Sequence, residues 1–289
     1  METNNRDYNS ISPSAKVLLQ VKGVTKIPFA KEVAAMIAAE ETDLPFINEE
    51  TPYFWGRVVH FENRYWSIDQ LLKDLPVKNI LELSSGFSFR GLDRVLHHKD
   101  CHYIDTDLPG VIAAKRNFTD SLLPVDHHQM GNLEMLPLNA LDDAAFQSVI
   151  SRFDAGEIAI VNEGLLMYLG ITEKKKLCQS IRRALQQHGG YWTTADIYIR
   201  MEMDDPRMQQ NDPLSKFFEQ HKIRENMFDS FEAAEAFFRE EGFVIDQEAT
   251  LDPSVLTGLA YFRKHYTAEQ MEVMSKAQKI QATWRLKLA

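Results

Sequence analysis

Residues 80–91, ILELSSGFSFRG, are the stretch of sequence on which the fold class depends. The stretch begins like a buried strand that carries one carboxylate, Glu82, and then turns through two serines and Gly86. A single glycine lets the backbone approach a ligand closely at one point. Because a lone glycine is weak support for a nucleotide-binding loop, this stretch alone is equally consistent with a plain turn between a strand and a helix.

Downstream of this stretch, segments of strand length alternate with helical patterns. Four further strands are predicted at residues 101–107, 132–139, 157–163 and 191–199. The helices predicted between them lie at residues 90–98, 110–118, 142–153 and 173–188, and the last is expected to start at a Thr172 cap and to stop at Gly189. Such alternation indicates a parallel sheet with helices on both faces.

Upstream of the stretch, residues 1–75 are predicted to form a helical cap that belongs to the same domain. Apolar side chains recur at helical spacing within residues 29–37 and again within residues 54–72. Arg64 lies along the flank of the second apolar stripe, from where a packed helix can direct a guanidinium into a pocket.

The core is predicted to span residues 76–289, with an insertion at residues 200–230. The insertion is a candidate substrate lid, because its apolar side chains could line an adaptable pocket. An ordinary packing insertion is an equal alternative. The side chains concerned are Met201, Met203, Met208, Phe217 and Phe218.

Two strands are predicted near the C-terminus, at residues 243–250 and 255–264. Their connection at residues 251–254 is too short for a crossover helix, so the pair should be antiparallel. A final helix is predicted from the capping-box spacing of Thr267 and Gln270, with a buried stripe of Val273, Ala277, Ile280 and Trp284. Five β–α units followed by an antiparallel pair resemble the class I S-adenosylmethionine-dependent methyltransferases. The expected fold is therefore α/β and Rossmann-like, with a mostly parallel seven-stranded sheet.

The composition restricts the partners that we expect. The formal net charge of −10 argues against a nucleic-acid surface, and no apolar run approaches the ~20 residues that span a bilayer. The polar N-terminus lacks the apolar segment of a signal peptide, and Cys101 and Cys178 do not form a disulfide framework. We expect a cytoplasmic protein with a small-molecule acceptor and with no nucleic-acid, membrane or metal partner.

Two carboxylates follow predicted strands at positions where a ligand would lie. Asp107 ends the second strand, 21 residues beyond Gly86, and an acid at this spacing can accept hydrogen bonds from both ribose hydroxyls. Asp105 lies two residues earlier, on the same side of the strand. Glu163 follows the fourth strand between two apolar runs, where an unpaired charge is rarely buried. The alternative interpretation of Asp107 is a solvated strand end, and that of Glu163 is a helix cap or an ion pair.

Several segments resemble the leucine carboxyl methyltransferase family, which includes small-molecule and polyketide O-methyltransferases. Residues 82–90, ELSSGFSFR, are similar to the family motif E-L-G-A-G-L-D-T-R. Residues 105–109, DTDLP, resemble E-V-D-L-P, and residues 163–169, EGLLMYL, match the third motif. Residues 63–72, NRYWSIDQLL, and 12–16, SPSAK, resemble the family's upstream arginine and lysine segments.

The resemblance implies S-adenosylmethionine as the cofactor. It implies that Lys16 and Arg64 hold the methionine carboxylate, that Asp107 holds the ribose and that Glu163 holds the methionine ammonium. The full set of implied cofactor residues is Lys16, Arg64, Glu82, Ser84, Gly86, Asp107, Leu108, Asn139, Ala140, Leu141, Glu163 and Gly164, with residues 139–141 meeting the adenine. Ser84 and Ser88 depart from the family motif by replacing a glycine and an aspartate.

The expected activity is methyl transfer to a hydroxyl or carboxylate of a small molecule. Tyr168 and Asp196 are candidates for acceptor contact, and the sequence nominates no catalytic base. Methylation of a protein C-terminal carboxylate, an NAD(P)-dependent oxidoreductase and a non-catalytic binding module are the alternatives. The oxidoreductase would need a G-x-G-x-x-G loop after the first strand, which is absent here.

Overall fold

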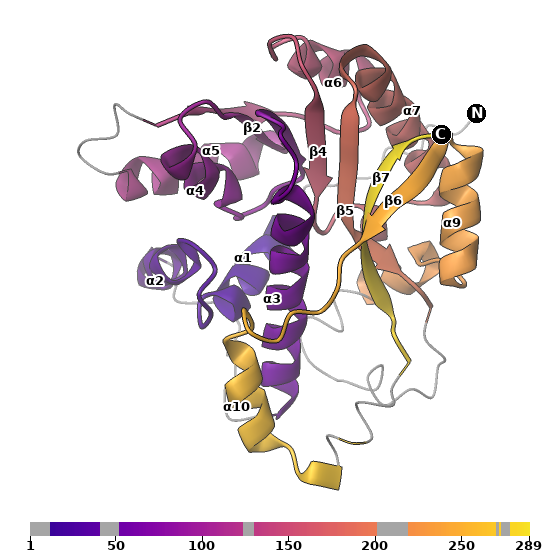
Figure 1. The fold of residues 1–289 in the computed structure, drawn as a ribbon. Helices are drawn as coiled ribbons and strands as arrows, with labels where there is room; N and C mark the ends of the chain where they lie inside the picture. The colour runs from indigo at the N-terminus through magenta and orange to yellow at the C-terminus, as the bar shows by residue number, and fades with distance from the viewer. Residues whose placement is uncertain (1–11, 41–51, 124–129, 201–218, 270–271, 273–277) are drawn as a thin grey trace.

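A seven-stranded sheet runs through the middle of the molecule (Figure 1). The computed structural model describes residues 12–40, 52–123, 130–200, 219–269, 272 and 278–289. The strand order is β3-β2-β1-β4-β5-β7-β6, in which the first five strands of the chain form four parallel pairs and β7 is antiparallel to both of its neighbours. The strands are β1 (Asn79–Leu83), β2 (His102–Asp107), β3 (Asn132–Pro137), β4 (Ile158–Asn162), β5 (Gly190–Tyr198), β6 (Phe243–Glu248) and β7 (Gln281–Leu288).

Helices cover both faces of the sheet, as the alternation of strands and helices predicts (Figure 1). Successive side chains of a strand point to opposite faces. Ile80 of β1 accordingly packs with Ile68 and Val95 on one face, whereas Leu81 and Leu83 pack with side chains of the opposite layer. The helices are α1 (Ser12–Lys22), α2 (Ala30–Glu40), α3 (Pro52–Leu72), α4 (Arg90–His97), α5 (Pro109–Leu122), α6 (Asp143–Ile150), α7 (Ile171–His188), α9 (Phe231–Glu240) and α10 (Gly258–His265), with short 3-10 turns η3 (Leu166–Tyr168) and η4 (Ile223–Asn226).

Two of the N-terminal helices, α1 and α3, lie near the carboxyl ends of the parallel strands. α3 packs against β5 and β7, because its stripe of Val58, Phe61, Tyr65 and Ile68 is buried. α1 lies against α2 and α3, and Leu19 of α1 shares an apolar cluster with Tyr65 and Phe89. This layer therefore brings side chains of α1 and α3 toward the edge of the sheet where β1, β2 and β4 end.

The antiparallel pair at the end of the chain is confirmed, but the sequence prediction misplaced its second strand. Residues 258–265 form α10 rather than a strand, and residues 281–288 form β7 rather than the end of a helix. Leu256, Leu259 and Phe262 have helical spacing, and Leu259 and Phe262 pack toward α3. Ala282, Trp284 and Leu286 alternate with more polar positions and are buried, which is the pattern of a strand.

The cap of α7 differs from the sequence prediction, and two other predictions fall outside the described residues. α7 begins at Ile171 with Gly170 as its N-cap, so Thr172 is not the cap; the Glu173 carboxylate accepts instead from the Gly170 N–H at 2.8 Å. The candidate lid side chains from Met201 to Phe218, and Val273 and Ala277 of the predicted final helix, lie outside the described residues. No helix in the described part of the chain is long and apolar enough to cross a membrane.

Candidate functional site

An open cavity of about 1200 Å³, measured with its mouth, lies over the carboxyl ends of β1, β2 and β4. In an open parallel sheet this edge, beside the switch in strand order, is where ligands bind. Most residues of the predicted cofactor set line the cavity. They are Arg64, Ser84, Gly86, Asp107, Leu108, Asn139, Ala140, Leu141, Glu163 and Gly164.

Asp107, the last residue of β2, holds the turn that follows β1. Its Oδ2 accepts from the backbone N–H of Gly86 at 2.7 Å, and its Oδ1 accepts from the N–H of Leu108 at 2.6 Å. Gly86 has φ +53°, a conformation that a glycine adopts without steric cost. Burial raises the pKa of Asp107, and the two N–H donors partly offset this. Each carboxylate oxygen keeps a second lone pair for a ligand hydroxyl.

Glu163, directly after β4, carries a negative charge among three cations. The Lys22 Nζ lies 2.6 Å from its Oε1, and the Arg90 Nη2 lies 3.5 Å from its Oε2. Burial raises the pKa of this carboxyl, but the charges of Lys22, Arg64 and Arg90 hold the pKa at about 2. Oε2 is buried and has no hydrogen-bond partner. Glu163 is therefore ionised and retains capacity to accept a hydrogen bond.

Lys22, which the sequence interpretation did not single out, is the α1 lysine that reaches the cavity. Ala15, Leu18, Leu19 and Lys22 all line it, because their spacing places them on one face of α1. Lys16, the lysine implied by the family resemblance, is not among the lining residues. Burial lowers the pKa of Lys22, opposed by the charge of Glu163. Helical spacing from the apolar residues of α1 was the signal that could have identified Lys22.

Arg64 reaches the cavity from α3 as predicted, and it also belongs to a buried ion pair. Its Nη2 donates to Asp196 Oδ1 at 3.0 Å, and both side chains are almost fully buried. The guanidinium carbon lies 5.6 Å from the ring centres of Phe61 and Tyr198. The Arg64 Nε has no hydrogen-bond partner, although it is buried. Arg64 thus presents positive charge to the cavity while Asp196 fixes its position.

Asp196 is not a cavity residue, so the structure does not support its prediction as an acceptor contact. Its carboxylate is 2% exposed and is surrounded by donors within the protein. By accepting from successive backbone N–H groups, it fixes the turn after β4 that carries Glu163. The five donors are Arg64 Nη2 and Asn162 Nδ2, and the backbone N–H groups of Gly164, Leu165 and Leu166.

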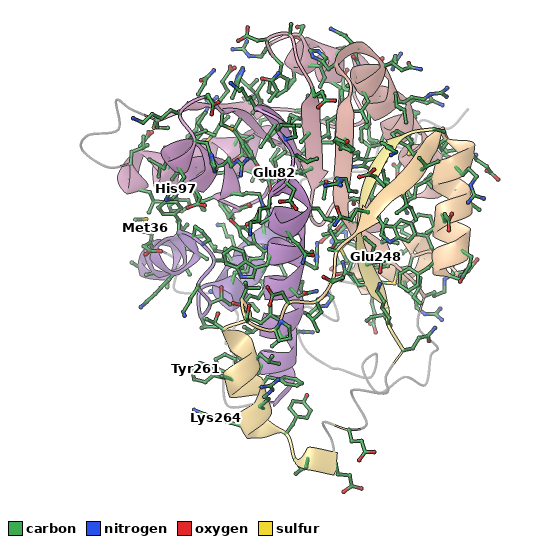
Figure 2. All side chains as sticks on the ribbon, viewed as in Figure 1. Met36, Glu82, His97, Glu248, Tyr261 and Lys264 are labelled. Carbon is green, nitrogen blue, oxygen red and sulfur yellow. The ribbon has the colours of Figure 1, made fainter. Side chains whose placement is uncertain are left out.

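Glu82, predicted as a cofactor residue, lies behind the cavity rather than on its wall. Its oxygens accept from Arg90 Nη1 at 2.7 Å and from the Tyr103 hydroxyl at 2.6 Å. Arg90 also donates to Asp69 and stacks over the ring of Tyr65, with 4.1 Å to the ring centre. Figure 2 shows Glu82 deep in the molecule beside α3. The Glu82–Arg90 pair therefore links β1 to α3 and α4.

A second buried ion pair, between Lys115 and Asp105, contacts the turn that follows β1. The Lys115 Nζ lies 2.6 Å from Asp105 Oδ2 and donates to Ser85 Oγ at 2.9 Å. Burial, opposed by the charge of Lys115, raises the pKa of Asp105 to about 6. Asp105 therefore faces the protein, and Asp107, two residues on, is the acid of this strand that lines the cavity.

One wall of the cavity is largely apolar. Phe61 of α3 and Met167, Tyr168 and Leu169 of the turn around η3 line it. An acceptor contact for Tyr168 stays a prediction. Behind this wall, His60 Nε2 lies 2.7 Å from the Tyr198 hydroxyl. Burial and the nearby charge of Arg64 lower the pKa of His60 to about 3, so its neutral imidazole is a weak base.

A buried lysine and an asparagine hold this apolar wall against η4. The Lys174 Nζ donates to the carbonyls of Leu169 and Asn226, both at 2.6 Å. The Asn226 side chain donates to the Met167 carbonyl at 3.1 Å. Lys174 is 3% exposed, and burial lowers its pKa to about 8. No pattern along the chain predicts this contact, since it joins segments that only tertiary packing brings together.

The sheet order, with β7 antiparallel between β5 and β6, together with a cavity at the ends of β1, β2 and β4, defines a Rossmann-like fold of the class I methyltransferase type. No family model and no curated protein matches the chain. Similar solved structures include a pericyclic reaction enzyme, at 12% identity and a TM-score of 0.45, covering 77% of this chain and 47% of that chain. The chain thus spans about half the length of that enzyme.

Two further similar structures are described as methyltransferases. One is a putative O-methyltransferase from Nostoc punctiforme PCC 73102, at 11% identity and a TM-score of 0.48, with 96% of this chain and 71% of that chain covered. The other is magnesium protoporphyrin IX methyltransferase from Synechocystis PCC 6803 with bound SAH, at 7% identity and a TM-score of 0.48, with 91% and 98% covered. At these values the likeness concerns only the course of the backbone.

Proposed function

We propose that this protein is an S-adenosylmethionine-dependent O-methyltransferase that acts on a small molecule. The observation that carries the proposal is the placement of Asp107 and Glu163 at the ends of the two strands that flank β1, on one cavity. One acid suits a ribose diol and the other an ammonium group. Lys22 and Arg64 add two cations at the Glu163 end, which suits a carboxylate beside that ammonium.

The cavity residues fit the parts of S-adenosylmethionine in order. Asp107 would accept from the ribose hydroxyls, and Glu163 from the α-ammonium. Lys22 and Arg64 would hold the α-carboxylate, and the unpartnered Glu163 Oε2 and Arg64 Nε are buried groups whose hydrogen bonds are incomplete. The side chains available to enclose the adenine are Leu108, Val111, Leu138, Asn139, Ala140 and Leu141. When bound, this cofactor supplies an electrophilic methyl group on a positively charged sulfur.

The chain's contribution to catalysis would be alignment and exclusion of water. Phe61 and Met167 form an apolar wall next to the Glu163 end, and Tyr168 adds a hydroxyl that could orient an acceptor. A hydroxyl acceptor needs a base, whereas a carboxylate acceptor does not. His60 is unsuited to that role, because its low pKa leaves it little affinity for a proton.

Membership of the leucine carboxyl methyltransferase family is the finer proposal. It is supported by the motif of residues 163–169 and by the cavity positions of Arg64, Asp107 and Glu163. A protein C-terminal carboxylate as acceptor stays an alternative within that family. An NAD(P)-dependent oxidoreductase is disfavoured by the antiparallel β7, since a dinucleotide-binding domain usually has a parallel strand in its place.

Calorimetric titration tests the proposal. S-Adenosylmethionine and S-adenosylhomocysteine should bind the wild-type protein. Asp107→Ala should weaken both by at least ~10-fold, because a charge-assisted hydrogen bond contributes about 1.5–3 kcal/mol. Asp154→Ala, an exposed acid far along the chain, is the matched control and should bind like wild type. Binding of NADH without binding of S-adenosylhomocysteine would contradict the proposal, as would unchanged affinity in Asp107→Ala.

A methyl-transfer assay distinguishes an enzyme from a non-catalytic binding module. The protein should move a labelled methyl group from S-adenosylmethionine to an acceptor in a panel of apolar phenols, enols and carboxylic acids. A peptide ending in a free carboxylate belongs in the same panel, because transfer to it alone would favour the protein-directed alternative.

A further inference from the structure

Ser84, the first residue after β1, has a backbone conformation that side chains rarely adopt. Its φ is +50°, in the left-handed region, where a Cβ atom crowds the following carbonyl. Glycine would avoid this cost. The other described residues of this kind, apart from glycines, are Phe29 and Lys222, and neither lines the cavity. Strained backbone of this type tends to persist at ligand-binding sites.

The strand register places Ser84 midway between the two acids that face the cavity. Glu82 pairs with Asp105, so Ser84 is level with Asp107 at the end of β2. Leu83 pairs with Asn162, so Ser84 is also level with Glu163 beyond β4. Neighbouring strands lie ~4.8 Å apart. A ligand held at its two ends by these acids therefore passes over Ser84.

The Ser84 hydroxyl forms no hydrogen bond with any described residue, although neighbouring serines do. Ser85 Oγ accepts from Lys115 Nζ at 2.9 Å, and Ser88 Oγ accepts from the Arg90 N–H at 3.3 Å. Ser84 lines the cavity, and none of the described residues uses its hydroxyl. The left-handed conformation and the unused hydroxyl together indicate a side chain placed for a ligand.

We infer that Ser84 contacts the bound cofactor between its ribose and its ammonium group, with the hydroxyl oxygen toward the charged sulfur. This inference rests on the proposed function. A hydroxyl dipole on the wall of a partly enclosed cavity stabilises a nearby positive charge more than it would in bulk solvent. Ser84 therefore favours the cationic cofactor over the neutral thioether that remains after methyl transfer, and so assists exchange of product for fresh cofactor.

Two substitutions separate the hydroxyl from the backbone strain. Ser84→Gly removes both, whereas Ser84→Ala removes the hydroxyl and keeps the Cβ. By calorimetry, each should bind S-adenosylmethionine about 10-fold more weakly and S-adenosylhomocysteine less than about 3-fold more weakly, as for loss of one contact to a charged group. Thermal unfolding should show Tm raised by about 2 °C in Ser84→Gly and not raised in Ser84→Ala.

Lys222→Gly is the matched control, because Lys222 is exposed and has φ +54° outside the cavity. It should raise Tm similarly and leave both affinities at wild-type values. If wild type binds both ligands and the Ser84 variants keep the wild-type ratio of affinities, the inference is overturned while the proposed function stands. If wild type binds neither ligand, the proposed function fails and the inference fails with it.

Discussion

Asp107 of β2 and Asp196 of β5 are both buried acids toward the carboxyl ends of strands in one sheet, yet they differ in what surrounds them. Asp196 accepts five hydrogen bonds, from Arg64, from Asn162 and from three consecutive backbone N–H groups. Asp107 accepts two, both from backbone, and lines the cavity. The protein satisfies the first carboxylate completely and leaves the second with free lone pairs.

This difference separates residues that build the site from residues that meet its ligand. A sequence motif marks both kinds alike, since both are charged side chains at strand ends. The number of donors that the protein itself supplies distinguishes them. Lysines can be divided in the same way. Lys174 builds the site, because two backbone carbonyls of the protein accept its hydrogen bonds. Lys22 lines the cavity, as Asp107 does, and is placed to meet the ligand.

The largest expected effect is on stability, from Asp196→Asn. The amide would place N–H groups against N–H donors and leave the Arg64 charge buried without its partner. Removing one member of a buried pair costs about 3–5 kcal/mol, and we expect a loss in that range in urea-induced unfolding. Asp107→Asn should cost about 1 kcal/mol or less. Equal losses of unfolding free energy in the two variants would contradict the distinction between a carboxylate that builds the site and one that faces the ligand.

Lys174→Met should have the next largest effect. The substitution leaves the carbonyls of Leu169 and Asn226 without their shared donor, and a buried polar group left unpaired costs about 1–3 kcal/mol. We expect a loss of about 2 kcal/mol by urea unfolding, with cofactor affinity within about 2-fold of wild type. Lys175→Met is the control, because Lys175 is half exposed and a surface pair contributes little. A large loss of affinity with unchanged stability would place Lys174 on the ligand side instead.

Lys22→Met tests the cavity side of the comparison. Loss of its charge should weaken S-adenosylmethionine binding by about 10-fold, equivalent to ~1.4 kcal/mol. Lys16→Met, six residues earlier on the same helix, should change affinity less than about 2-fold. The same calorimetric titration measures both. The opposite ranking would restore Lys16 as the family lysine and remove Lys22 from the site.

The smallest effect concerns the pH dependence of stability, through His60. Burial, together with the charge of Arg64, lowers its pKa from 6.5 to about 3 in the folded state. Because the unfolded chain then binds more protons between these values, stability falls as pH falls below 6.5. Between pH 7 and pH 5.5 the His60 contribution lowers the free energy of unfolding by about 1 kcal/mol. His60→Gln should reduce that decline in urea unfolding measured at both pH values, and an unchanged decline would assign the pH dependence to other groups.

Local patterns were sufficient for most of the fold. The order of strands and helices from residue 52 to residue 200 follows from apolar patterns, because the helices bury one face against the sheet and the central strands are short apolar runs buried on both faces. The same reasoning failed after residue 250. Residues 255–264 are apolar at several positions that suit either a strand or a helix, and only packing of Leu259 and Phe262 against α3 decides for a helix.

The site was predictable where an acid ends a strand, as Asp107 does, or directly follows one, as Glu163 does. It was not predictable where a side chain's partner comes from a distant segment. Glu82 and Asp196 also belong to strands, but Arg90 and Arg64 arrive from helices and pair with them. Whether an acid faces a ligand or a buried arginine depends on that tertiary contact, which spacing along the chain does not specify.

The position of β7 has a consequence for the order in which the chain folds. β7 lies between β5 and β6 and is separated from β5 by more than 80 residues of sequence. Until it inserts, β5 and β6 each present an unpaired edge that can associate with other chains. Loop closure over such a distance is slow. The sheet is therefore expected to be completed only when residues 281–288 pair with β5 and β6. Conditions that delay this pairing should promote aggregation of the incompletely folded chain, even where the folded structure itself is unchanged.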